Sequence, residues 1–185
     1  KYNFLDFPQS PALFKRAHAA GMGVIAMKTL GGAKHVDLAA FRGKEDSYER
    51  AALKWVLSNP HVSGLVISME RFEQVRNYAA ASGRKLAAND QGLLHRYAEL
   101  TRTEVCSFCE DCHAACPAGL PVADVLRFSM YHDQYGQRAE ARRLYRPLSG
   151  AVASACAGCD APCESDCFHG LPVRTKMIAA HGSLA

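Results

Sequence analysis

The sequence predicts an α/β chain in which a partial (β/α)8 barrel, represented by its last strands and helices, precedes a mainly helical domain. Short apolar runs alternate with helical patterns over about the first 85 residues, as in parallel strands that are linked by helices. All eight cysteines, by contrast, lie in the last 80 residues. We therefore predict a barrel part over residues 1–87, a connecting helix over residues 88–103 and a cysteine-rich helical domain over residues 104–185.

The first predicted helix runs from Pro11 to Ala20, because Ser10 can cap its N-terminus and Gly21 follows its end. The next segment, Gly23 to Met27, is a continuous apolar run of the kind found in parallel strands that are buried on both faces. A polar, glycine-rich turn from Lys28 to Gly32 ends this predicted strand.

A second helix is predicted from about Ser47 to Ser58. The second apolar run, Gly64 to Ser68, is a predicted strand and leads into a helix over about Arg71 to Ala81. The glycines that open the two strands, Gly23 and Gly64, lie 41 residues apart, which suits one βα unit of a barrel.

The rest of the chain has a helical pattern. Asn89 or Asp90 can cap the connecting helix, and Pro121 and Pro172 each stand where a helix would start, just after a cysteine run. The segment between the cysteine runs has a second predicted helix over Glu140 to Tyr145 and, before it, one helical stripe of apolar residues. The stripe consists of Val122, Val125, Leu126 and Met130.

Charge and hydropathy exclude two classes of partner. The net charge of +4 is spread over the chain and is too small for a nucleic-acid-binding surface. No apolar stretch approaches the length of about 20 residues that crosses a bilayer. We therefore predict no nucleic-acid partner and no membrane span.

The eight cysteines form two runs of four. The first run has the spacing CxxCxxCxxxC and is followed by Pro117, which is typical of the ligands of a [4Fe-4S] cluster. The second run repeats the first at an offset of 50 to 51 residues, with one extra residue between its second and third cysteines and with Phe168 in place of the proline. The predicted metal ligands are Cys106, Cys109, Cys112, Cys116, Cys156, Cys159, Cys163 and Cys167.

Two other interpretations of the cysteines stay open. Zinc binds the same thiolates, although zinc sites usually pair two CxxC motifs. Disulfides would suit a small secreted protein that is poor in core, whereas this chain is 49% hydrophobic. We expect two [4Fe-4S] clusters, with two zinc sites or four disulfides as the alternatives.

Several segments resemble the C-terminal part of the aldo/keto reductases. They are YNFLD at residues 2–6, GMGVIAMKTLGG at residues 21–32, AALKWVLSNP at residues 51–60 and GLVISM at residues 64–69. Together with the duplicated cysteine runs, they more narrowly resemble the branch of this family that carries a C-terminal ferredoxin-like extension.

This resemblance implies a complete barrel in the full-length protein, a nicotinamide cofactor and the reduction of a small carbonyl substrate. The Tyr, Lys, Asp and His that perform this reduction in the family lie in the first half of the barrel, upstream of Lys1. We therefore expect an oxidoreductase fragment, assign it no catalytic residue and expect the fragment alone to be inactive with NADPH. The rival hypothesis is an electron-carrier or binding module with a non-catalytic barrel.

The resemblance also implies which residues contact the nucleotide. The turn after the first strand would follow the nicotinamide and pyrophosphate, and the turn after the second strand would surround the adenosine; alternatively, the first is a plain flexible turn. Glu70 and Asn77 depart from the family pattern, so NADP, NAD, an altered pose and loss of the nucleotide all stay open. The expected contacts are Met27, Lys28, Leu30, Gly31, Gly32, Ser68, Arg71 and Gln74.

Two-cluster ferredoxins indicate how the sulfurs would be shared, since each run there sends its fourth cysteine to the other cluster. By that resemblance, Cys116 and Cys167 would be exchanged between the two runs. The clusters would relay electrons to an unidentified redox partner or only support the domain. His113 and His169, next to ligands, either tune the potential or have no special role. Iron–sulfur chemistry favours a cytoplasmic location, with export of the folded full-length protein left open.

Overall fold

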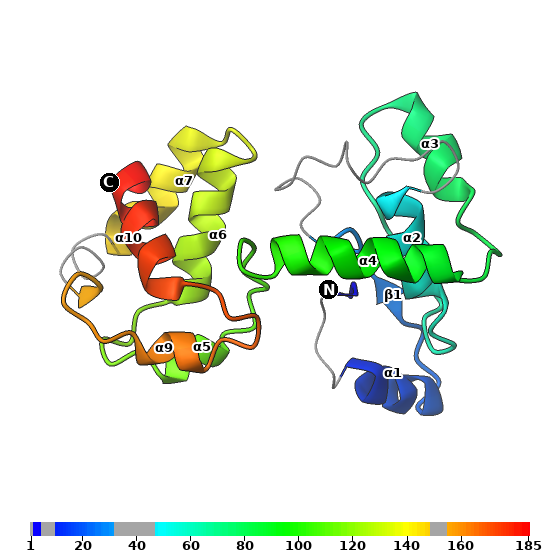
Figure 1. Ribbon diagram of the computed structural model, residues 1–185, viewed down its shortest axis with the longest axis horizontal. Coiled ribbons are helices and arrows are strands. Elements are labelled where there is room, and N and C mark those ends of the chain that lie inside the picture. Colours follow the sequence, from blue (N-terminus) through cyan, green and yellow to red (C-terminus); the bar gives the residue numbers. More distant parts are fainter. Residues whose placement is uncertain (1, 5–9, 32–46, 149–154) are drawn as a thin grey trace. The chain divides into compact units, whose positions relative to one another are not determined.

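The structure is a computed structural model that describes residues 2–4, 10–31, 47–148 and 155–185 (Figure 1). The chain divides into two compact units, Lys1–Thr101 (unit 1) and Arg102–Ala185 (unit 2), and each unit has a core of its own. None of the described helices is long and apolar enough to cross a membrane.

Unit 1 is mainly helical over its described residues. Its elements are α1 (Ser10–Ala19), β1 (Ile25–Ala26), α2 (Tyr48–Leu57), β2 (Gly64–Leu65), α3 (Phe72–Ala79) and α4 (Ala88–Thr101). The predicted helices of this part of the chain are confirmed to within a few residues at their ends. Ser47 caps α2, because its hydroxyl accepts the N–H of Arg50 at 3.2 Å.

The predicted partial (β/α)8 barrel is wrong. Over the described residues, β1 and β2 are the only strands, and they pair in parallel over two residues each. Ala26 is buried against α2, but its neighbour Ile25 is 57% exposed, and so is Val66 just after β2. A barrel strand belongs to a closed sheet and is buried on both faces. This strand pair has apolar residues exposed on one face, so unit 1 is a helical unit with a small parallel ladder.

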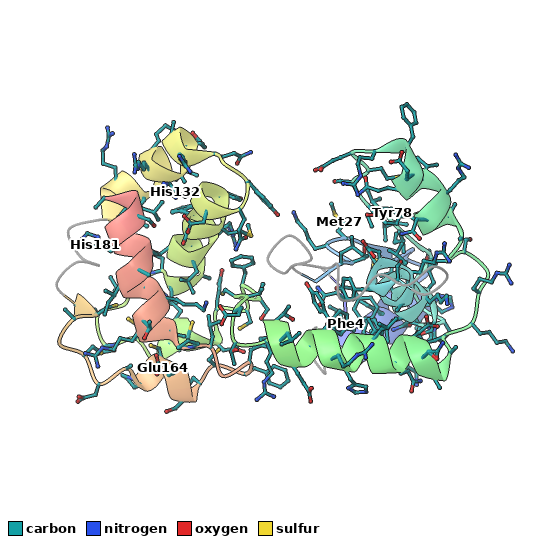
Figure 2. The ribbon with its side chains drawn as sticks, turned by 45° about the horizontal axis from the view of Figure 1, so that its top comes forward. Phe4, Met27, Tyr78, His132, Glu164 and His181 are labelled. Atoms are coloured by element: carbon teal, nitrogen blue, oxygen red, sulfur yellow. The ribbon has the colours of Figure 1, made fainter. Side chains whose placement is uncertain are left out.

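The main core of unit 1 lies between α2 and α4. Tyr48 and Tyr97 stack with ring centroids 3.9 Å apart, and Phe4 packs edge-on against both rings (Figure 2). Beside them, Lys54 Nζ lies 3.0 Å from both carboxylate oxygens of Asp90, which is buried. The helix that was predicted to connect two domains therefore packs into unit 1, where aromatic stacking and an ion pair hold it.

Over its described residues, unit 2 contains helices and loops but no strand. Its elements are α5 (Asp111–Ala114), α6 (Val122–Asp133), α7 (Arg138–Tyr145), the 3-10 helix η2 (Arg146–Leu148), α9 (Pro162–Ser165) and α10 (Val173–Leu184). Pro121 and Pro172 immediately precede α6 and α10, which confirms the two predicted helix starts. The helices α6, α7 and α10 lie side by side, and the short helices α5 and α9 lie together (Figure 1). The unit 2 core includes the side chains of Cys112 and Cys163.

Candidate metal centres

The two cysteine runs form similar loops, in which the third cysteine lies in the short helix α5 or α9. In each loop, a residue two positions after a cysteine has a positive φ, which is 57° at both Phe108 and Ala161. This left-handed backbone is uncommon outside glycine. It accompanies a hydrogen bond to sulfur, since Phe108 N–H donates to Cys106 Sγ at 3.4 Å and Ala161 N–H donates to Cys159 Sγ at 3.3 Å.

The fourth cysteine of each run accepts a similar hydrogen bond. The N–H of Leu120 donates to Cys116 Sγ at 3.4 Å, and the N–H of Leu171 donates to Cys167 Sγ at 3.3 Å. The glycine before each leucine has a positive φ, 58° in the first run and 64° in the second. The turn after each run therefore holds its fourth cysteine by the same kind of contact.

Four cysteines line one cavity of unit 2, which we call the first cavity. Its empty space is about 360 Å³, part of it open to solvent. Burial and, to a smaller extent, nearby thiols together raise the pKa of Cys112 to about 12. These thiols are Cys106, Cys109, Cys167 and Cys163. The cysteines that line the first cavity are Cys106, Cys109, Cys112 and Cys167, so the last comes from the second run.

The other four cysteines line a second cavity, with an empty space of about 390 Å³ that includes open solvent. Burial raises the pKa of Cys156 and of Cys163, and the thiol of Cys116, from the first run, raises both further. The cysteines that line the second cavity are Cys116, Cys156, Cys159 and Cys163. The structure thus gathers the eight cysteines in two groups of four, with Cys116 and Cys167 exchanged between the runs. Metal binding by these groups stays a prediction.

Two valines line both cavities. Val122 is the first residue of α6, Val173 is the first residue of α10, and both are almost fully buried. They occupy equivalent positions, 51 residues apart, in the duplicated sequence. The two cavities therefore share an apolar wall that the duplication builds from both halves.

Acidic residues surround the first cavity. Glu110 lines it, and an open depression beside it is lined by Glu110, Asp111 and Asp166 together with two of the four cysteines. Phe168 also lines this depression and is 59% exposed. The first cavity therefore lies next to an open, negatively charged surface of unit 2.

A cation lines the second cavity instead. The Arg174 guanidinium donates to the Ala157 carbonyl at 2.9 Å, and its charge lowers the pKa of Cys156 against the larger effects of burial and nearby thiols. The backbone N–H of Arg174 donates to the Glu164 carboxylate at 2.9 Å. Arg174 is not among the residues predicted for the site. The repeat held a signal for it, because Ala123 occupies the equivalent position in the first copy.

The two histidines next to cysteines have different surroundings. His113 Nδ1 lies 3.0 Å from the Leu120 carbonyl oxygen, and the N–H of the same leucine donates to Cys116 Sγ. His169 lines the first cavity and packs edge-on against Phe168, with ring centroids 5.2 Å apart. His113 thus contacts the turn at Cys116 through a single intervening residue, Leu120.

The turn after β1, which was predicted to contact a nucleotide, is held by unit 1 tyrosines. Tyr48 donates from its hydroxyl to the Leu30 carbonyl at 2.5 Å, and Tyr97 donates to the Gly31 carbonyl at 3.2 Å. Because the two tyrosines belong to α2 and α4, the turn is fixed to the core of unit 1. This observation disfavours a plain flexible turn at these two residues.

The remaining predicted nucleotide contacts lie on the turns after β1 and β2. Gln74 caps α3, since its Oε1 accepts the N–H of Glu70 at 2.7 Å and that of Arg71 at 2.9 Å, and its Nε2 donates to Tyr78 at 3.1 Å. Gly32 lies outside the described residues. Nucleotide contact stays a prediction for these residues. The exposed ones are Met27, Lys28, Ser68 and Arg71.

The eight cysteines, all within the described residues, are not joined by disulfides. Among the described residues, no three His, Cys, Asp or Glu side chains form a group that would hold a single metal ion. Each group of four sulfurs borders a cavity instead. Compared with known proteins, the chain matches no family model, no curated protein and no solved structure.

Proposed function

We propose that unit 2 binds two [4Fe-4S] clusters and acts in one-electron transfer, as the electron-transfer part of an oxidoreductase. The observation that carries the proposal is the arrangement of eight cysteines around two cavities of similar size, four to each. A [4Fe-4S] cluster takes four cysteine thiolates as its protein ligands. Both the number and the grouping of the sulfurs therefore fit two clusters.

The spacing of the cysteines favours [4Fe-4S] clusters over single zinc ions. Zinc sites usually pair two CxxC motifs, whereas the first run is one string of four cysteines followed by Pro117. The backbone N–H groups that donate to sulfur add further support, because they stabilise thiolate ligands.

Different residues of unit 2 would insulate the two clusters and expose one of them to a partner. When bound, each cluster supplies a one-electron redox couple. Val122 and Val173 keep the space between the cavities apolar. The open depression beside the first cavity brings Cys109 and Cys167 to the surface, where a redox partner can approach. This exposure favours electron transfer over a purely structural role.

Metal and sulfide analysis tests the proposal. After anaerobic expression and purification of the whole 185-residue chain, we expect about eight iron and about eight labile sulfide per chain. A count of about four would limit the proposal to one centre, and zinc without sulfide would overturn it. Reversible reduction by dithionite, with the electrons recovered on a one-electron acceptor, would support transfer; clusters that cannot be reduced would leave only the structural role.

For unit 1, a relationship to aldo/keto reductases and contact with a nicotinamide stay proposals. The predicted barrel no longer supports them. The chain has a single tryptophan, Trp55, whose ring centroid lies 4.9 Å from that of Tyr2 in the core of unit 1. Titration with NADH and with NADPH, followed by the fluorescence of this tryptophan, tests for binding. Saturable quenching by either nucleotide would support a cofactor site, and no response to both would remove it.

A further inference from the structure

We infer that the second centre is more easily reduced than the first, and that Arg174 sets this difference. The inference rests on the proposed function, because it concerns clusters in both cavities. It goes beyond that function by ranking the two centres and by assigning a tuning role to one side chain. Its basis is the unequal distribution of charge around two cavities whose backbones are alike.

Around the second cavity, a fixed cation is present. Arg174 lines the cavity, and the 2.9 Å hydrogen bond from its guanidinium to the Ala157 carbonyl holds the charge in place. Glu164, on α9 (Figure 2), is the nearest opposing charge that the contacts identify, since it accepts the N–H of Arg174. Asp160 is exposed and does not line the cavity. Glu164 raises the pKa of Cys163 and Arg174 lowers that of Cys156, so the second cavity is next to one charge of each sign.

Around the first cavity, the charges are negative. Glu110 lines the cavity, and Asp111 and Asp166 line the adjoining depression. Two cations of the same unit are already paired: Arg127 lies 3.3 Å from an oxygen of Asp124, and Lys176 lies 2.9 Å from an oxygen of Glu104. Carboxylates thus lie at and beside the first cavity, and no arginine or lysine is among the described residues that line it.

Reduction adds one negative charge to a centre, so a nearby cation favours it and nearby carboxylates oppose it. Ala123, which lines the first cavity, is the sequence equivalent of Arg174 and carries no charge. One charge at a distance of about 10 Å in a protein environment changes the reduced-to-oxidised ratio about tenfold. That ratio corresponds to about 59 mV for a one-electron couple. The second centre therefore takes the first electron.

An anaerobic redox titration of the whole chain, followed by electron paramagnetic resonance, tests the inference. The wild-type protein should be reduced in two separate steps. Arg174→Gln, which keeps a hydrogen-bond donor, should lower the higher potential by about 59 mV and leave the lower one in place. Arg174→Lys should restore the wild-type value. Glu110→Gln should raise the lower potential, and Arg138→Gln, which removes an exposed charge that lines neither cavity, should change neither.

The outcomes separate this inference from the proposed function. Two clusters with equal potentials, or an Arg174→Gln variant in which both potentials are unchanged or the lower one moves, would overturn the inference and leave cluster binding intact. A loss of iron from Arg174→Gln with full iron in Arg174→Lys would show a structural role and would also overturn it. Wild-type protein without iron and sulfide would overturn both.

Discussion

The exchange of fourth cysteines between the two runs predicts which substitutions share a centre. Removing Cys106 and Cys109 together leaves the first group with two sulfurs, too few for a cluster, and leaves the second group complete. This Cys106→Ala/Cys109→Ala background should therefore hold about four iron per chain, half of the full content. In this background, the remaining iron depends on Cys116 and is independent of Cys167.

Two triple variants provide the assay. Adding Cys167→Ala to the background should leave the count at about four iron, because Cys167 belongs to the group that is already lost. Adding Cys116→Ala should reduce the count well below four, because it removes one of the four ligands of the remaining centre. Iron and labile sulfide are measured on protein purified without oxygen, and the visible absorbance follows the same loss.

The comparison includes its own control for folding. Both triple variants carry the same number of substitutions and differ only in which terminal cysteine is missing. A general loss of structure would lower both counts together, and equal low counts would contradict the crossed arrangement. If Cys167→Ala removes the iron while Cys116→Ala does not, each run holds its own cluster, and the grouping of sulfurs that we describe is wrong.

Three further predictions concern unit 1, with Trp55 fluorescence during urea unfolding as the measurement. Lys54→Met should lower the free energy of unfolding by about 3 kcal/mol, because it leaves the buried Asp90 carboxylate without its cation, and adding Asp90→Asn should recover part of the loss. Gly92→Ala, in the middle of α4 with no atom within 4 Å of the added methyl group, should raise it by about 1 kcal/mol. Burial raises the pKa of Tyr97, so the unfolded chain ionises first, and unit 1 should lose stability as the pH rises above about 10. Tyr97→Phe should make the loss of unfolding free energy with pH less steep. An unchanged slope would contradict the assignment of this loss to Tyr97.

The helix starts of unit 2 and the two cysteine runs could be predicted from the sequence because their signals are local. A proline fixes φ for the first turn of a helix, so Pro121 and Pro172 mark the starts of α6 and α10 without any knowledge of packing. The spacing of cysteines is set by loops of a few residues. The exchange of fourth cysteines came from a resemblance, and the cavities bring the sulfurs together in that same pattern.

The sequence did not reveal that unit 1 lacks the expected barrel over its described residues, because the burial of a strand depends on what covers each of its faces. The apolar run from Gly23 to Met27 indicated a strand buried on both faces. In the structure, Ala26 is buried while Ile25 and Met27 are exposed, which is the alternation of a strand covered on one face. Because the residues on the exposed face are also apolar, the sequence does not show this alternation of buried and exposed positions. Whether a second layer covers the other face distinguishes the two cases, and composition does not show this.

Arg174 was not predicted because it lies where the two copies of the repeat differ. The positions that the copies share, in the repeated Gly-Leu-Pro-Val segment, do locate the turn and the shared valine wall. The charge difference comes from a position just after that segment, where Ala123 in one copy corresponds to Arg174 in the other. If unit 2 only needed to hold two metal groups, two equivalent cavities would be enough. An open acidic surface beside one cavity and a fixed cation in the other give the two halves different electrostatics, and the proposed ranking of the two centres rests on this difference.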